Sequence, residues 1–220
     1  MTKVDQGSSP ITTSANSWYL RVSLAGLIGT LVLLAYPLDS LANQNLTVHM
    51  FQHIGLFVFS AVFGFGLERA LLGKILQLRK KAYNVWRAYV SLVKFNTRTK
   101  GLVFAAFLPA VAFSYWHFPS NFDLAVTNGG VHVLEHLSYI TSGSLVGASF
   151  LALPRKLKAG LLVFGFMTAG MMGSMMLVSP NFYSVYSVTQ NTQMDSTIMI
   201  FGAIGMTATS SWLLKILDVI

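Results

Sequence analysis

Two pairs of histidines have the spacing that places two imidazole rings on one face of a helix. His49 and His53 form the first pair, and His132 and His136 form the second. Side chains four residues apart in a helix are neighbours, with Cβ atoms about 5–6 Å apart, so each pair can hold one metal ion. His117 lies between the pairs and completes the chain's five histidines. Imidazole binds copper, zinc, iron and nickel, so the five histidines predict a metal site.

Carboxylate and thioether side chains near these histidines extend the candidate site. Glu135 directly precedes the last histidine, and Asp123 precedes the second pair. Either carboxylate could accept the second N–H of a ligating histidine or bind the ion itself. Thioethers select Cu(I), and the candidate soft ligands are Met50, Met175 and Met176. The alternatives stay open: acids in loops are commonly solvated, and methionine commonly fills gaps between helices.

The helices that carry these residues are expected to cross a membrane. The 220 residues are 54% hydrophobic and only 10% charged, whereas a soluble domain has about 25% charged residues. The apolar runs are apolar on every face, and a span needs roughly 20 such residues. We therefore predict an all-α protein, a polytopic six-helix transmembrane bundle. The expected spans are 18–37, 48–72, 101–118, 131–153, 159–178 and 196–217.

The rest of the chain fits one membrane domain. Residues 1–17 are polar and rich in serine and threonine, so they are predicted to form a disordered tail before a six-helix domain at 18–220. The motif Gly143-x-x-x-Gly147 predicts close packing of one helix against another. There is no cysteine, which excludes disulfides and thiolate metal ligands. Neither common nucleotide-binding glycine motif occurs.

Lysine and arginine predict the orientation. Connection 73–100 holds eight of these residues and connection 154–158 holds three, whereas 38–47, 119–130 and 179–195 hold none. The positive-inside rule makes the two basic connections cytoplasmic, together with both termini. All five histidines then lie at the outer ends of spans of a multi-pass protein of the plasma membrane. The net charge of +8 is explained by the membrane and gives no reason to expect nucleic acid. Segment 73–100 is either a solvated connection or lies on the lipid surface.

Four segments resemble the CtaG family, assembly factors for cytochrome c oxidase that act on its copper centre. They are His49-Met50-Phe51-Gln52-His53, Trp116-His117-Phe118-Pro119, Phe122-Asp123-x-Ala125 and His132-Val133-Leu134-Glu135-His136-Leu137-Ser138. Their order and spacing fit from about 49 to 150. The chain is also similar to a family of uncharacterised archaeal membrane proteins. The resemblance implies copper handling at the outer face, with the five histidines as ligands.

Three functions compete at this point. The first is a membrane protein that holds copper at the histidine cluster for assembly of a membrane oxidase. The second is a non-catalytic helical subunit of a copper-dependent membrane oxidase or monooxygenase complex. The third is a b-type haem protein or a metal-dependent membrane enzyme, and zinc is an alternative ion. The pattern favours a non-catalytic role and leaves catalysis open. A histidine at a membrane interface can also simply bind water or head groups, whereas a buried one needs a partner.

Overall fold

The computed structural model describes residues 11–75, 99–150 and 153–216, and this part of the chain is helical without any strand. The prediction of an all-helical protein is therefore confirmed for it. The helices are α1 (Ile11–Leu34), α2 (Leu38–Ala42), α3 (Leu46–Ile75), α5 (Thr99–Trp116), α6 (Pro119–Thr127), α7 (Gly129–Ser149), α8 (Arg155–Val178) and α9 (Val188–Ile216).

Three of these helices are long and apolar enough to cross a membrane, through Ser17–Leu34, Leu46–Ala70 and Arg155–Val178. A shorter apolar stretch, Phe107–Trp116, lies in α5. Six spans were expected, and within the described ranges α7 and α9 do not reach the same apolar composition. The physical reason is visible in their sequences: α7 opens with two histidines and a glutamate, and α9 opens with a run of polar side chains.

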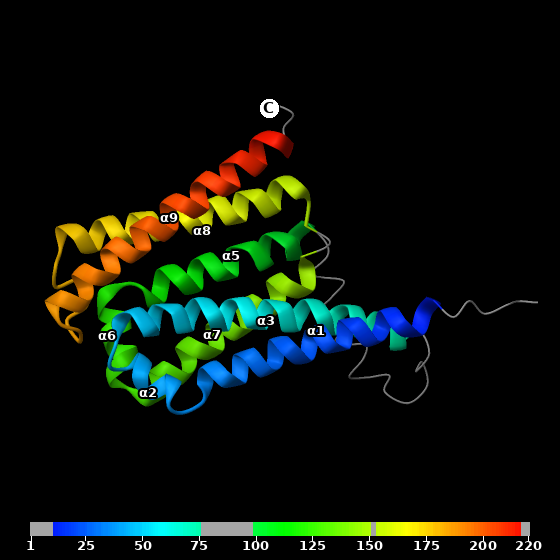
Figure 1. Ribbon diagram of the computed structural model, residues 1–220, viewed down its shortest axis with the longest axis horizontal. Coiled ribbons are helices and arrows are strands. Elements are labelled where there is room, and N and C mark those ends of the chain that lie inside the picture. Colours follow the sequence, from blue (N-terminus) through cyan, green and yellow to red (C-terminus); the bar gives the residue numbers. More distant parts are fainter. Residues whose placement is uncertain (1–10, 76–98, 151–152, 217–220) are drawn as a thin grey trace, which may run out of the picture.

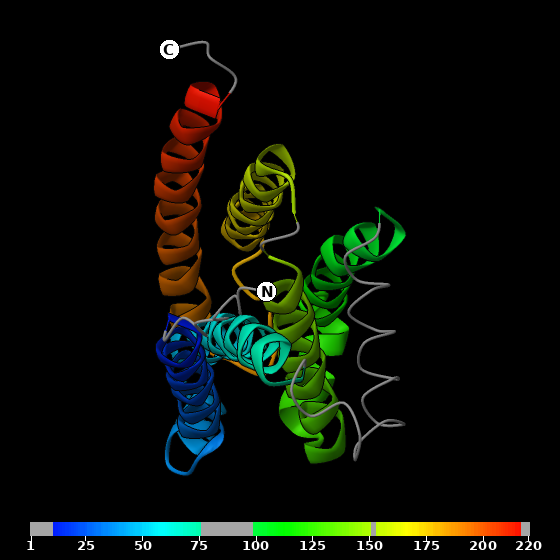
Figure 2. The ribbon, with the colours of Figure 1, turned by 90° about the vertical axis from the view of Figure 1, so that its right-hand side faces the viewer.

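The long helices form two groups (Figures 1 and 2). α3 packs against α1 on one side and α7 on another, and α5 packs against α7. α8 and α9 form a hairpin whose main packing is between its own two helices, and α9 also contacts α3. A buried apolar cluster joins the hairpin to the other helices, and it contains Leu46, Met50, Phe122, Met176, Tyr183, Tyr186, Met194 and Ile198.

α3 and α7 approach closely because glycine lies at their contact. A Cβ atom on Gly143 would collide with the Ser60 hydroxyl and the Phe57 carbonyl of α3. A Cβ atom on Gly147 would collide with the carbonyl of Ala61. The close packing predicted from the Gly-x-x-x-Gly motif is thus confirmed. This contact matters for the site because each of these two helices carries one histidine pair.

Several boundaries differ from those predicted. α1 begins at Ile11, so residues 11–17 are helical, although they were assigned to the disordered tail. Connection 119–130 contains helix α6, with Pro119 in its first turn, where a missing N–H costs nothing. α9 begins at Val188 instead of 196, because the Ser187 hydroxyl accepts a hydrogen bond from the Gln190 N–H in its first turn. Most of connection 73–100 lies outside the described residues.

Candidate metal centre

All five histidines lie at one end of the molecule, here called the histidine end, which also contains α2, α6 and the α8–α9 loop (Figure 1). His49 and His53 belong to the first two turns of α3, and His132 and His136 belong to the first two turns of α7. His117 follows the last residue of α5. The sequence thus folds three separate segments so that their histidines face a shared interior.

The imidazole rings lie close together. Ring centroids are 4.4 Å apart within the first pair and 4.1 Å apart within the second. Between the pairs, the centroids of His49 and His132 are 5.7 Å apart, and those of His53 and His136 are 5.6 Å apart. His117 lies 6.1 Å from His53 by the same measure. The structure therefore brings together every histidine that the sequence analysis named.

Glu135 lies at the centre of the rings. Its carboxylate is 3.4 Å from His53 Nε2, 3.8 Å from His49 Nε2 and 3.5 Å from His132 Nδ1. The side chains of His49, His53 and Glu135 are fully buried. Their potential ligand atoms all lie within 4.8 Å of one another, a spacing suited to one metal ion. We call these three residues the inner group.

Asp39 of α2 forms a second group with the other histidine pair. Its Oδ1 is 3.2 Å from His132 Nε2 and 3.9 Å from His136 Nδ1. These three residues, here the outer group, also have ligand atoms within 4.8 Å of one another. Burial alone would raise the pKa of the Asp39 carboxyl, but hydrogen bonds from Gln52 and His132 lower that pKa overall. The carboxylate is therefore charged at neutral pH.

The sequence analysis did not identify Asp39 as a site residue. Asp39 and His132 are separated by 93 residues, and nothing in the sequence near Asp39 has metal-ligand spacing. The only feature of the sequence that pointed to Asp39 was its position in connection 38–47, which lacks lysine and arginine and was therefore expected on the same side as the histidines. Its contact with the histidines arises only when α2 packs against α3 and α3 packs against α7.

A tyrosine of the α8–α9 loop fixes the orientation of His49. The Tyr186 hydroxyl donates a hydrogen bond to the Ala42 carbonyl at 2.9 Å and lies 3.0 Å from His49 Nδ1. Since that proton is already donated, the tyrosine oxygen accepts from His49 Nδ1–H. His49 Nε2 then carries the lone pair and faces Glu135, ready to bind a cation. Burial raises the pKa of Tyr186, which keeps its hydroxyl protonated.

His117 has a different environment and belongs to neither group. Its Nδ1 lies 2.8 Å from the Phe113 carbonyl, to which it donates, and its ring stacks on Phe113 with an interplanar angle of 11°. Tyr183 donates a hydrogen bond to the His117 carbonyl at 3.1 Å. The segment is thus held in place by its neighbours, and donation from Nδ1 leaves Nε2 as the nitrogen able to bind an ion.

The cluster contains buried polar atoms that make no hydrogen bond. Leaving such an atom unpaired costs about 1–3 kcal/mol, so buried polar groups are nearly always satisfied. Here the unpaired atoms converge on the same interior from two helices, and each imidazole among them has one lone pair that can bind a metal. They are His49 Nε2, His53 Nδ1, His53 Nε2, His132 Nδ1, His136 Nε2, Glu135 Oε1 and Glu135 Oε2. This donor set fits metal binding, in which one nitrogen of each histidine and the Glu135 carboxylate would be the ligand atoms.

The remaining predicted residues lie elsewhere. Asp123 Oδ2 accepts hydrogen bonds from the Ser184 hydroxyl at 2.6 Å and the Ser184 N–H at 3.1 Å. Asp123 therefore ties α6 to the α8–α9 loop. Met50 and Met176 are buried in the apolar cluster, whereas Met175 is 46% exposed. Asp123 belongs to neither the inner nor the outer group.

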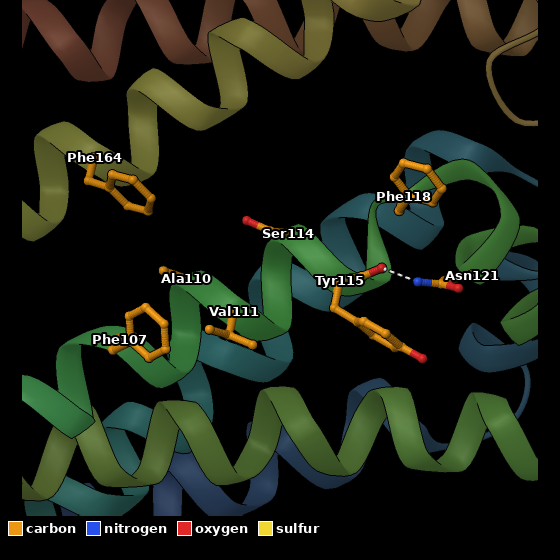
Figure 3. A pocket seen from close by; sticks show the side chains of 8 residues that line it. All are labelled: Phe107, Ala110, Val111, Ser114, Tyr115, Phe118, Asn121 and Phe164. Carbon is orange, nitrogen blue, oxygen red and sulfur yellow. Dashed lines mark hydrogen bonds between the residues drawn. The ribbon is translucent and has the colours of Figure 1, made fainter.

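A groove of about 510 Å³ lies along α5 and faces Phe164 of α8 (Figure 3). Its other lining residues are Phe107, Ala110, Val111, Ser114, Tyr115, Phe118 and Asn121. Asn121 donates a hydrogen bond to the Tyr115 carbonyl at 2.9 Å. These described lining residues include no histidine, carboxylate or methionine, so the groove is separate from the inner and outer groups.

An all-helical membrane protein with a buried histidine–carboxylate cluster is the class that the fold and the site define. The family model described as cytochrome c oxidase caa3 assembly factor (Caa3_CtaG) matches residues 12–214. The chain belongs to this family. The match also includes α8 and α9, beyond the segments that carried the resemblance in the sequence. No curated protein and no solved structure matches the chain.

Proposed function

We propose that this protein holds a copper ion at the histidine end, on the outer face of the plasma membrane, and supplies that ion during assembly of cytochrome c oxidase. Membership of the family supports the role in oxidase assembly. The observation that carries the copper proposal is the inner group, in which His49, His53 and Glu135 are buried and direct unpaired ligand atoms at one another. The ion is cargo, so the protein itself needs no catalytic step.

Copper is preferred because of the ligand types and the client. Imidazole is a ligand that suits copper as well as zinc. The family assists an oxidase, and the sequence resemblance associates this assistance with the oxidase's copper centre. The negative charge of Glu135 offsets the charge of a monovalent ion, which lowers the cost of burying that ion.

The proposed topology is a multi-pass bundle of six spans within domain 18–220, surrounded by lipid and with both termini cytoplasmic. The distribution of charge along the molecule supports this topology. Arg155, Lys156 and Lys158 lie at the start of α8, and Lys215 lies near the end of α9, at the end of the molecule opposite the histidines (Figure 1). Basic residues concentrate on the cytoplasmic side, so the histidine end faces outward.

Metal analysis of purified protein tests the copper proposal. We expect the wild-type protein, loaded with Cu(I) in detergent, to retain copper after desalting. The variant with both His53→Ala and His136→Ala should lose it, because each pair then keeps a single imidazole. A matched control changes Thr207 of α9 to alanine, since the Thr207 hydroxyl donates to the Ala203 carbonyl of its own helix.

Two results would overturn the proposal. Unchanged copper in the double histidine variant would show that copper binds elsewhere, and preferential retention of zinc from an equimolar mixture would give the site another cargo. A Soret band in the purified protein would instead indicate haem. Copper-free oxidase in cells that produce the histidine variant, with normal oxidase in cells that produce the control, would link the site to assembly.

A further inference from the structure

We propose that the cluster holds two ions at once, one in each group, and that the outer group is the position through which an ion enters and leaves the inner group. This inference rests on the proposed function, because it describes the path of the same cargo. The inner group (His49, His53 and Glu135) and the outer group (Asp39, His132 and His136) share no residue, so the two groups do not compete for a ligand.

The two groups differ in access to the surroundings. Side chains of the inner group are 0% exposed, so no donor or acceptor protein can touch an ion held there. In the outer group the Asp39 side chain is 35% exposed, whereas His132 and His136 are 10% and 7% exposed. A carboxylate at the surface with two imidazoles behind it can receive an ion from outside and pass it inward.

His132 connects the two groups. Its Nε2 lies 3.2 Å from Asp39 of the outer group, and its Nδ1 lies 3.5 Å from Glu135 of the inner group. One imidazole therefore faces a carboxylate of each group with its two ring nitrogens. An ion can move between the groups by exchanging ligands one at a time, with the ring proton of His132 on whichever nitrogen does not bind the ion.

The outer carboxylate is held in place before any ion arrives. Gln52 of α3 is 3% exposed, and its Nε2 donates to Asp39 Oδ1 at 3.1 Å and to the Leu33 carbonyl at 2.7 Å. These bonds connect the end of α1, α2 and α3 at the edge of the cluster. A buried amide that orients a carboxylate is typical of metal sites, because hydrogen bonds from neighbouring side chains keep a ligand directed at its ion.

Counting bound Cu(I) by competition with a chromogenic chelator tests this proposal. We expect two equivalents for each wild-type chain and one for Asp39→Asn, which keeps the size of the side chain but weakens the outer group. Asp39→Glu should restore the second equivalent. Asp123→Asn is the matched control, because this acid lies at the same end and contacts Ser184 instead of the histidines.

The rate at which Cu(I) is released shows whether the outer group is the route to the inner group or only a second, independent binding site. When the chelator is added to protein loaded with one equivalent, we expect slower release from Asp39→Asn than from wild type, because the remaining ion has lost its exit ligand. Two equivalents retained by Asp39→Asn, or one equivalent bound by wild type, would overturn the proposal and leave the copper function intact. No copper on wild-type protein would instead overturn the proposed function.

Discussion

His53 Nε2 lies 3.4 Å from Glu135 Oε1, with both side chains fully buried. A buried carboxylate beside unpaired imidazoles is the main electrostatic feature of the inner group. We predict that Glu135→Gln, which keeps the shape and removes the charge, weakens Cu(I) binding by about 10–100-fold. Chelator competition measures the affinity. Glu68→Gln is the control, because Glu68 pairs with Arg69 at 3.3 Å, away from the cluster. Equal affinities of Glu135→Gln and wild type would contradict the prediction.

Tyr186→Phe should affect both stability and binding. The change removes the hydroxyl that donates to the Ala42 carbonyl and accepts from His49 Nδ1. The Ala42 carbonyl keeps the hydrogen bond from the Asn45 N–H, but the buried His49 Nδ1 is left unpaired. We expect a loss of about 1–3 kcal/mol in the free energy of unfolding and weaker copper binding, because His49 is no longer held in one orientation. Thermal unfolding in detergent checks the first effect. Tyr115→Phe, at a side chain that is 55% exposed, should change neither quantity.

Gly147→Ala tests whether the contact between α3 and α7 positions the two histidine pairs. The added Cβ would collide with the Ala61 carbonyl, so the helices must separate. We predict a destabilisation of about 1–3 kcal/mol and reduced copper retention, although no ligand is altered. Gly160→Ala introduces the same methyl group where no atom lies within 4 Å. The two variants should therefore differ, and equal stability would show that the helices adapt without cost.

The absence of cysteine allows a direct test of topology. Single cysteines at Ser120 of α6 and Lys156 of α8 occupy exposed positions near opposite ends of the molecule. In intact cells, an impermeant maleimide should label Ser120→Cys, and Lys156→Cys should be labelled only after the membrane is opened. The reverse pattern would place the histidine end in the cytoplasm and contradict delivery on the outer side.

Copper loading should stabilise the folded protein. An ion that binds only the folded state raises its stability by about 2.7 kcal/mol when the free ion is at 100 times its Kd. We predict a higher unfolding temperature for wild type with Cu(I) than without it. The variant with His53→Ala and His136→Ala should show no increase, and an equal increase in both proteins would indicate binding outside the cluster.

The gathering of the histidines was predictable because it depends on local spacing and on the alternation of helix direction. Pairs four residues apart share a helix face, and the basic connections placed every pair at the same end. The close contact at Gly143 and Gly147 was predictable for the same reason, since a small-residue motif has a local signature.

Asp39 and Tyr186 were not predictable, because each reaches the cluster through packing between segments distant in the sequence. Asp39 lies 93 residues from His132, and Tyr186 lies 137 residues from His49. Helix α6 was missed because a proline and a glycine turn bracket it and suggested a loop. The early start of α9 was missed because a polar first turn was assigned to the connection.

Tyr186 connects the α8–α9 loop to the His49 ring of the inner group. The α8–α9 hairpin packs mainly upon itself, yet its loop carries the hydroxyl that holds the His49 ring. A client that binds along the hairpin and draws this loop away would release the ring and lower the affinity for the cargo. Thermodynamic reciprocity then requires the cargo to change the affinity for that client. The loaded and empty forms of the protein would then differ in their affinity for such a client.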